Sequence, residues 1–221
     1  RRSSNSGTTN YDGEAYVVFG RPSFSGIAEI RASTLNGATG FKATGLVGQQ
    51  AFTGASVSGG GDINGDGLDD LIIGAPGYSN DTYDNADGRA YVVFGKTNLG
   101  SSGTLTLTSL SGSNGFILNA GGATDLAGTS VSITGDTNGD GFDDILVGAP
   151  RANYHGGHAY VIFGASNISV PTNLDALNGV NGFKLIGNPD EYAGDTVEFA
   201  DLNGDGLDDI LIGQPKSTKG R

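Results

Sequence analysis

The stretch GDINGDGLDDLIIGAP at residues 61–76 recurs as GDTNGDGFDDILVGAP at 135–150 and as ADLNGDGLDDILIGQP at 200–215. Each copy contains the pattern D-x-N-x-D-G-x-x-D and runs directly into an apolar, β-branched segment. Alternating oxygen side chains around a glycine turn are typical of loops that bind a hard divalent cation, and short β-branched runs are typical of strands. The three copies therefore predict metal-binding loops joined to strands in a repeat architecture.

Calcium is the metal that these loops favour. It takes six to eight oxygen ligands in a flexible shell, whereas magnesium requires near-ideal octahedral geometry. The glycine after the third ligand, Gly67 in the first copy, permits the tight bend because glycine reaches positive φ without a steric clash. We expect three Ca²⁺ sites, in which the leucine or phenylalanine offers its backbone carbonyl, with these ligands: Asp62, Asn64, Asp66, Leu68 and Asp70; Asp136, Asn138, Asp140, Phe142 and Asp144; Asp201, Asn203, Asp205, Leu207 and Asp209.

Two other readings of the loops are weaker. An EF-hand loop begins with the same spacing but needs a bidentate glutamate at position twelve, where this chain has Ile73, Val147 and Ile212. An EF-hand also needs flanking helices, and the flanks here are strand-like. Asp, Asn and Gly clusters also form ordinary turns. Three copies with the same ligand spacing favour the metal site over plain turns.

The composition of the chain limits its function. The 221 residues include 24 acidic and 12 basic residues, for a formal net charge of −12, and twelve of the acids lie in the three loops. Three calcium ions would bring the charge to −6, so the acidity reflects the expected metal sites rather than a disordered acidic tail. No basic face is available for nucleic acid, no apolar run is long enough for a membrane span, and there is no cysteine for a disulfide. The absence of methionine leads us to expect a processed or excised piece.

Other motifs recur along the chain with about the same spacing as the loops. The segment AYVVFG at 15–20 and 90–95 matches AYVIFG at 159–164, and Phe41, Phe116 and Phe183 each follow a glycine after a polar turn. Helical periodicity is weak, and the strand-like runs are short, which indicates an all-β fold of β-propeller blades. We expect one propeller region over residues 1–221 in three units, at approximately 41–95, 116–164, and 183–215 completed by 14–20.

The chain resembles the FG-GAP repeat family, the blades of the integrin α-chain β-propeller and its bacterial relatives. The resemblance rests on Gly74-Ala75-Pro76 and Gly148-Ala149-Pro150, on the acidic loops before them and on the Tyr-Val-Val-Phe-Gly strands after them; the third copy has Gln214 in place of the alanine. It implies four-stranded antiparallel blades with calcium held between the first two strands. It also implies a module for adhesion or recognition at cell surfaces.

Three units are too few to close a propeller, which usually has about four to eight blades. We therefore expect either a two-fold homodimer that completes six blades or a chain cut from a longer array, and a two-fold dimer is the commonest closed symmetry.

No catalytic site is expected. The adjacent pairs Asp69-Asp70, Asp143-Asp144 and Asp208-Asp209 lie where neighbouring side chains point to opposite faces of a strand, which is poor geometry for shared acid–base work. His155 and His158 are expected to be a surface-loop pair, with a transition-metal site as the alternative.

The function that we expect is a calcium-stabilised module for extracellular or cell-surface recognition, binding an unknown protein or carbohydrate. A non-catalytic accessory domain of a secreted enzyme and a structural repeat of a surface layer or matrix are the alternatives, because a fold does not fix a function.

Overall fold

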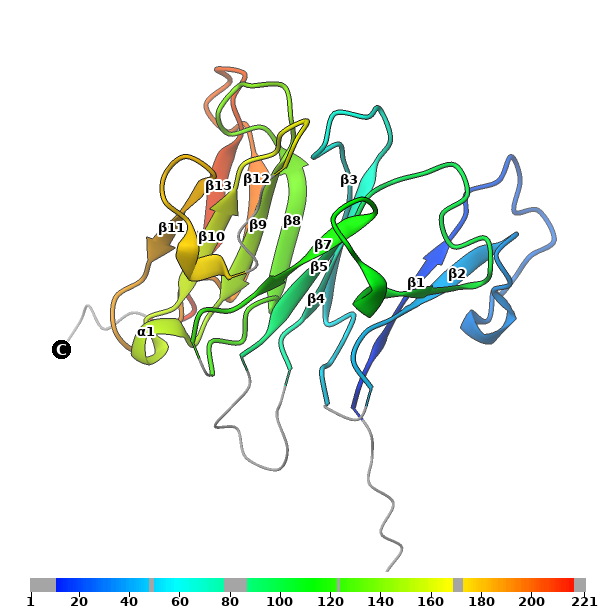
Figure 1. Cartoon of the computed structure of the whole chain (residues 1–221), viewed down its shortest axis with the longest axis horizontal. Helices are drawn as coiled ribbons and strands as arrows, with labels where there is room; N and C mark the ends of the chain where they lie inside the picture. Colours follow the sequence, from blue (N-terminus) through cyan, green and yellow to red (C-terminus); the bar gives the residue numbers. More distant parts are fainter. Residues whose placement is uncertain (1–10, 48–49, 78–86, 123, 169–172, 217–221) are drawn as a thin grey trace, which may run out of the picture.

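Short strands form the whole fold, in four sheets that stand side by side (Figure 1). The computed structural model describes residues 11–47, 50–77, 87–122, 124–168 and 173–216. Two of the four sheets have four strands each, and the other two flank them. This arrangement confirms the prediction of an all-β fold built from blade-like units.

The two four-stranded sheets are complete antiparallel blades. The first blade runs β3-β4-β5-β7, and the second runs β8-β9-β10-β11. Their strands are β3 (Ser56–Gly61), β4 (Asp70–Ala75), β5 (Arg89–Val93) and β7 (Gly115–Asn119), then β8 (Ser130–Gly135), β9 (Asp144–Ala149), β10 (His158–Ile162) and β11 (Gly182–Ile186).

The flanking sheets each contain half of such a blade. The N-terminal half-blade pairs β1 (Glu14–Val18) with β2 (Gly40–Thr44), which also contacts the short parallel strand β6 (Thr104–Thr106). The C-terminal half-blade pairs β12 (Thr196–Ala200) with β13 (Asp209–Gly213). The first corresponds in sequence to the outer two strands of a blade, and the second to the inner two.

The sheets group the strands differently from the units expected from the sequence. Each Gly-Phe strand closes the sheet of the strands before it, because it pairs in register with the preceding AYVxFG strand: Val17 faces Phe41, Val92 faces Phe116 and Val161 faces Phe183. In this chain β1 pairs with β2. Completion of the 183–215 unit by residues 14–20 therefore stays a prediction, which concerns contacts beyond a single copy.

Among the residues that the structure describes, helical structure is confined to single turns. These are η1 (Ala32–Thr34), η3 (Leu107–Ser109), α1 (Ala152–His155) and η4 (Leu174–Ala176). Within the described ranges, no helix has the length and apolar character needed to cross a membrane.

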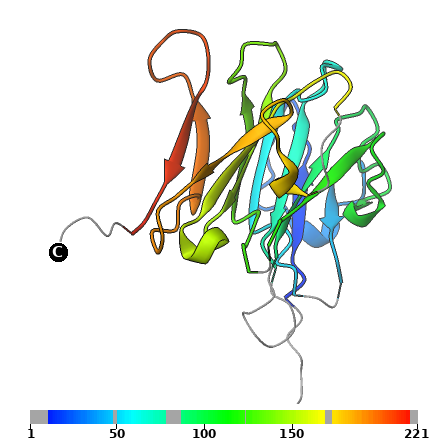
Figure 2. The same ribbon diagram turned by 60° about the vertical axis from the view of Figure 1, so that its left-hand side comes forward.

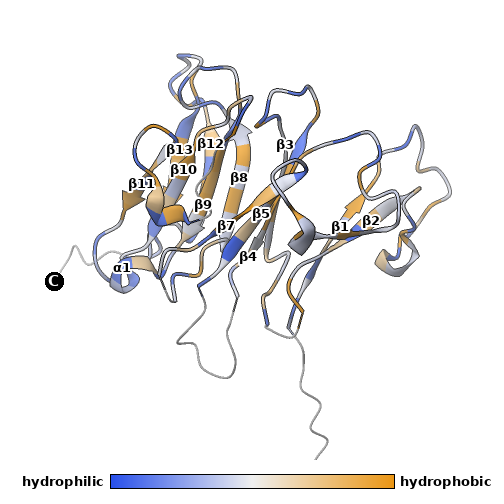
Figure 3. Cartoon of the chain, in the orientation of Figure 1, coloured by the Kyte–Doolittle hydropathy of each residue, from blue (hydrophilic) through white to orange (hydrophobic). Residues whose placement is uncertain are grey.

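Apolar side chains fill the spaces between successive sheets. Consecutive residues of a strand enter different cores: Ile73 packs toward the N-terminal half-blade, whereas Ile72 packs between the two complete blades. Leu146 likewise enters the core shared with the C-terminal half-blade, in which Phe199 lies. Because both faces of each complete blade are covered, the second and third strands of a blade are mostly apolar runs. Figure 3 shows hydrophobic colour on strands such as β8 and β9, whereas much of β3 is hydrophilic.

Glycine marks the points where adjacent blades touch through their backbones. Gly54, Gly128 and Gly194 have φ of +87°, +86° and +87°, and each precedes an inner strand. A Cβ at Gly74 would lie 2.1 Å from the carbonyl oxygen of Gly128 in the next blade, and a Cβ at Gly148 would lie 2.0 Å from that of Gly194. The glycine of the GAP motif is therefore required for close packing between blades.

Candidate metal centres

The three acidic loops connect the inner two strands of successive sheets. They join β3 to β4, β8 to β9 and β12 to β13, and all three project from the same edge of the stack (Figures 1 and 2). The fold thus collects twelve carboxylates along one rim, although the loops lie more than 60 residues apart in sequence.

Each loop is shaped by the carboxylate of its first aspartate. Asp62 accepts hydrogen bonds from the backbone N–H groups of Gly65 (2.8 Å), Asp66 (3.0 Å) and Gly67 (2.8 Å). Asn64 Oδ1 accepts from Asp66 N at 2.8 Å. Such side-chain-to-backbone bonds hold tight turns in place.

The other two loops repeat this arrangement. Asp136 accepts from Gly139 N at 2.7 Å and Gly141 N at 2.9 Å, and Asp201 accepts from Gly204 N at 2.7 Å and Gly206 N at 3.0 Å. The common spacing in the sequence therefore produces a common conformation.

The last aspartate of each of the first two loops anchors the loop to its blade. Asp70 is buried and accepts from Ile63 N at 3.0 Å and from Gly95 N at 2.7 Å, one bond to each carboxylate oxygen. Asp144 accepts in the same way from Thr137 N and Gly164 N, both at 3.0 Å. This anchoring role was missed in the sequence, where these residues were expected only as metal ligands.

The electrostatics of the loops favour a bound cation. Burial is the main cause that raises the pKa of Asp70 to about 6; the negative charges of Asp66 and Asp62 contribute to this rise, and the backbone hydrogen bonds oppose it. The pKa of Asp144 is also raised, chiefly by burial, with a contribution from the charge of Asp140. A divalent cation beside these groups would offset the crowding of negative charge.

The donor chemistry fits calcium, since every candidate ligand supplies oxygen. Each oxygen of Asp70 accepts one hydrogen bond and so keeps a lone pair. In the described part of the chain, however, no three acidic or histidine side chains are grouped so that they could hold a metal ion. The carboxylates of Asp62 and Asp66 accept from loop amides instead. The structure brings the candidate residues into one loop each without assembling a shell, and the ligand sets stay predictions.

In the second and third copies, a second aspartate links its loop to the preceding loop. The Asp143 carboxylate accepts from Asp62 N at 2.7 Å, while Asp143 N donates to Asp62 O at 3.3 Å. Asp208 makes the same pair with Asp136, at 3.0 Å and 3.1 Å. The invariant D-D of the three copies was the available signal for this contact. It means that neighbouring loops are coupled directly through their backbones.

The expectation of a surface-loop histidine pair is wrong for His158. This residue begins β10 and is buried, with Nδ1 3.0 Å from the Tyr160 hydroxyl oxygen, and burial lowers its pKa. His155 stacks on Tyr192 with the ring centroids 5.3 Å apart. The two imidazoles have separate partners, so the geometry gives no support to a shared transition-metal site.

Among the described residues, two buried acids lie outside the loops, Asp125 and Glu191. Asp125 accepts from Gly122 N at 2.9 Å, and burial raises its pKa to about 6. That pKa already includes smaller upward contributions from the charges of Asp175 and Asp87 and downward ones from the Gly122 hydrogen bond and Lys184. Because the pKa rises on folding, the protonated form favours the folded state. The stability contributed by Asp125 is present below about pH 4 and is lost as the pH rises through about 6.

We expect Asp125→Asn to flatten the pH dependence of stability. Between pH 4 and pH 7, the unfolding free energy of the wild type should fall relative to that of the variant by about 1–3 kcal/mol, because each pKa unit is worth about 1.4 kcal/mol. Urea unfolding at several pH values measures this difference. The exposed Asp195→Asn is the matched control, and equal slopes for both variants would show that Asp125 does not titrate in this range.

Comparison with known proteins places the repeats in a family. The FG-GAP repeat family matches residues 53–93, 127–162 and 193–221, so that each match includes one acidic loop. Integrin alpha-5 of Xenopus laevis is 32% identical over 156 residues, which cover 69% of this chain and 14% of the relative. Phosphatidylinositol-glycan-specific phospholipase D of Bos taurus is 32% identical over 160 residues, covering 70% of this chain and 18% of the relative. Integrin alpha-4 of Xenopus laevis is 30% identical over 156 residues, 69% and 13% of the two chains.

The chain spans less than a fifth of the length of these relatives, so the likeness concerns their repeat regions. The first two matched segments each cover the inner two strands, the acidic loop and the third strand of a complete blade, and the last covers β12, its loop and β13. The repeated loop, the four-stranded antiparallel blades and the three matches agree. This chain belongs to the FG-GAP repeat family.

Proposed function

We propose that this protein is a calcium-stabilised β-propeller segment that serves extracellular recognition or adhesion. The observation that carries the proposal is the alignment of three D-x-N-x-D-G-x-x-D loops, in one conformation, along one rim of successive blades (Figure 1). Nine carboxylates, three side-chain amide oxygens and three backbone carbonyls are the donors of the three sites. An all-oxygen set of this kind suits calcium rather than zinc or copper.

The role of calcium in this proposal is structural. Each ion would neutralise the carboxylates of one loop and join the start of the loop to the buried aspartate at its end. Since the loops are linked through Asp143 and Asp208, an ion in one loop also supports its neighbour. The charge of the rim would fall from that of twelve carboxylates to half of it when three ions are bound.

Two observations support the proposed recognition role: the likeness to integrin relatives and the variable segments of the chain. The likeness to integrin alpha-5 and integrin alpha-4 covers about 69% of this chain. The segments between the repeated motifs differ in sequence from unit to unit, for example 96–114 and 165–181. Variable loops on a rigid scaffold are where binding surfaces usually form. A protein or carbohydrate ligand is the partner class that we propose.

A non-catalytic accessory domain of a secreted enzyme is the second candidate. The likeness to phosphatidylinositol-glycan-specific phospholipase D, at 32% identity over 70% of this chain, favours it. A catalytic domain in the same open reading frame would select this role, and a reading frame made only of repeats would select recognition or adhesion.

Calorimetric titration with calcium tests the metal sites directly. We expect three sites per chain in the metal-free wild type, with dissociation constants of about 10⁻⁴–10⁻³ M as in extracellular calcium modules. Asp66→Ala should lose one site only, because the loops of the other blades keep their own ligands. Asp195→Ala removes an exposed acid outside the loops and should keep all three. Fewer than three sites in the wild type, or three in Asp66→Ala, would contradict the proposal.

A further inference from the structure

The three acidic loops share a chemically labile dipeptide. Asparagine is among the thermolabile residues, because the backbone nitrogen of the next residue can attack its side-chain carbonyl carbon. Glycine in that next position leaves the attack unhindered, since it has no Cβ. The dipeptide occurs at the third and fourth positions of the loops, as Asn64-Gly65, Asn138-Gly139 and Asn203-Gly204. Its glycine is exposed to water in all three loops, so each loop carries a potential site of deamidation.

The fold does not allow a less reactive residue in place of the glycine. Gly65, Gly139 and Gly204 have φ of +72°, +73° and +76°, in the left-handed region that favours glycine. A Cβ at Gly65 would also lie 2.5 Å from Cε1 of Phe142 in the second loop, and one at Gly139 would lie 2.9 Å from Cδ2 of Leu207 in the third. Backbone conformation and contact with the next loop therefore both require glycine.

The asparagine of each pair also has a structural role. Its side-chain oxygen accepts a hydrogen bond from the backbone N–H two residues further on, from Asp66 N to Asn64 at 2.8 Å, from Asp140 N to Asn138 at 2.9 Å and from Asp205 N to Asn203 at 2.8 Å. Such a bond closes a tight turn. A side chain without an oxygen would lose it, so both halves of the labile pair are needed for the shape of the loop.

We propose that the first aspartate of each loop blocks deamidation of the asparagine-glycine pair beside it, so that Asn64, Asn138 and Asn203 are latent modification sites. The glycine N–H of each pair donates to Oδ1 of this aspartate, from Gly65 to Asp62 at 2.8 Å, from Gly139 to Asp136 at 2.7 Å and from Gly204 to Asp201 at 2.7 Å. The inference concerns the protein without calcium and does not rest on the proposed function.

Deamidation requires the atom that this hydrogen bond holds. The glycine nitrogen must lose its proton to solvent, form a bond to Cγ of the asparagine and release the side-chain nitrogen, which takes up a proton and leaves as ammonia. Water then opens the resulting five-membered ring at either carbonyl, which gives aspartate or isoaspartate. A carboxylate beside the N–H opposes the loss of its proton, because the negative charge disfavours a second one. The charge-assisted bond also directs the nitrogen toward the aspartate.

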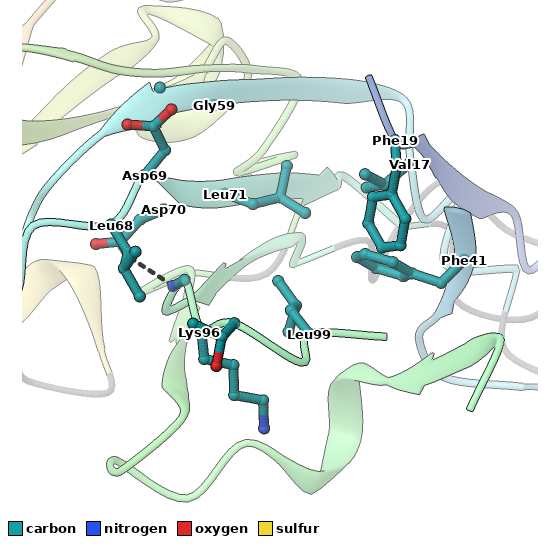
Figure 4. A pocket seen from close by; sticks show the side chains of 13 residues that line it. Val17, Phe19, Phe41, Gly59, Leu68, Asp69, Asp70, Leu71, Lys96 and Leu99 are labelled. Carbon is teal, nitrogen blue, oxygen red and sulfur yellow. Dashed lines mark hydrogen bonds between the residues drawn. The ribbon is translucent and has the colours of Figure 1, made fainter. Parts of the chain in front are cut away.

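Conversion would change the loop in two ways. Isoaspartate carries the main chain through the former side chain, and the added carbon would shift Gly65 relative to Asp62. Either product also adds a carboxylate to a loop that already has four acidic residues. Figure 4 shows the two acids at the end of the first loop, Asp69 and Asp70, with the hydrogen bond that holds Asp70 as a dashed line. Another negative charge in this loop would increase the repulsion among its carboxylates.

Peptide mapping by mass spectrometry measures the reaction, since each conversion changes the mass of one peptide. The wild type is incubated at neutral pH in EDTA, once folded and once unfolded in urea. The three loop asparagines should convert at least about tenfold more slowly in the folded protein, because a hydrogen bond to a charged group is worth at least the roughly 1.4 kcal/mol that a tenfold change in rate represents. Equal rates in the folded and unfolded protein would overturn the proposal without any variant.

Three variants of the first loop, also in EDTA, test the role of the aspartate. Asp62→Ala removes the acceptor, so Asn64 should convert at least about tenfold faster than in the wild type. Asp66→Ala is the matched control, since it removes another carboxylate of the same loop and leaves the bond from Gly65 to Asp62 in place. Asp62→Asn keeps an acceptor oxygen and should convert Asn64 more slowly than Asp62→Ala does.

The third loop provides an internal reference in the same chain. Asn203 should keep its wild-type rate in Asp62→Ala, because its glycine is held by Asp201. Equal rates for Asn64 in Asp62→Ala and Asp66→Ala would overturn the proposal. An equal rise at Asn203 and Asn64 would also overturn it, since that result would show general loosening of the fold rather than loss of one hydrogen bond.

Discussion

Removal of calcium is expected to lower the melting temperature by about 10–30 °C, the largest effect that we foresee for this protein. A ligand that binds only the folded state stabilises it by RT ln(1 + [L]/Kd). With dissociation constants of about 10⁻⁴–10⁻³ M and 10 mM calcium, each site contributes about 1.4–2.7 kcal/mol. Three sites together contribute about 4–8 kcal/mol, and each kcal/mol shifts the melting temperature of a domain of this size by about 2–4 °C.

Differential scanning calorimetry in EDTA and in 10 mM calcium, at matched ionic strength, measures this shift. Magnesium at the same concentration should stabilise the protein much less, because magnesium requires near-ideal octahedral geometry and gives up its waters reluctantly. The triple variant Asp66→Asn, Asp140→Asn, Asp205→Asn should lose most of the response, whereas Asp195→Asn should keep it. Equal melting temperatures in EDTA and calcium would rule out a structural role for calcium.

Gly148→Ala is expected to destabilise the fold by about 3 kcal/mol, more than most single substitutions. The added Cβ would lie 2.0 Å from the carbonyl oxygen of Gly194, which is backbone of the next sheet. Neither side can yield by a side-chain rotation, because both contacting groups belong to the main chain. Thermal unfolding should show a melting temperature lower by roughly 10 °C.

Gly213→Ala is the matched control for this substitution. It occupies the same motif position in the third copy, where the nearest atom to an added Cβ is the hydroxyl oxygen of Thr196, at 2.0 Å, and the nearest backbone atom, Thr196 O, is 3.5 Å away. Rotation of that hydroxyl costs only about 0.5–1.5 kcal/mol. Equal losses of stability in the two variants would show that the contact between blades is not what requires glycine at residue 148.

The repeated loop and its flanks were sufficient to predict the all-β blades, because alternating ligands, a glycine turn and β-branched runs act locally. The phase of the sheets was not predictable in the same way. A Gly-Phe strand such as Gly115–Asn119 lies between two loops in sequence, and only the register with Val92 shows which sheet it completes.

Contacts between segments that lie far apart in the sequence could not be predicted from the sequence alone. Asp143 looks like a neighbour of a ligand in the sequence, but its carboxylate reaches Asp62, 81 residues away. Tyr16 and Tyr91 sit in the same AYVVFG motif, yet one is exposed and the other buried, because exposure depends on the sheet beside them. The glycines before His158 suggest a loop, whereas pairing with Ala149 makes it the first residue of a strand.

The paired bonds between Asp62 and Asp143 and between Asp136 and Asp208 also have a mechanical meaning. At each junction two hydrogen bonds of opposite direction cross from one sheet to the next, at the rim rather than in the core. A force that pulls neighbouring sheets apart must therefore break two polar bonds before it separates the apolar faces beneath them. The hydrogen bonds between neighbouring acidic loops therefore connect the sheets along the rim and resist their separation under tension.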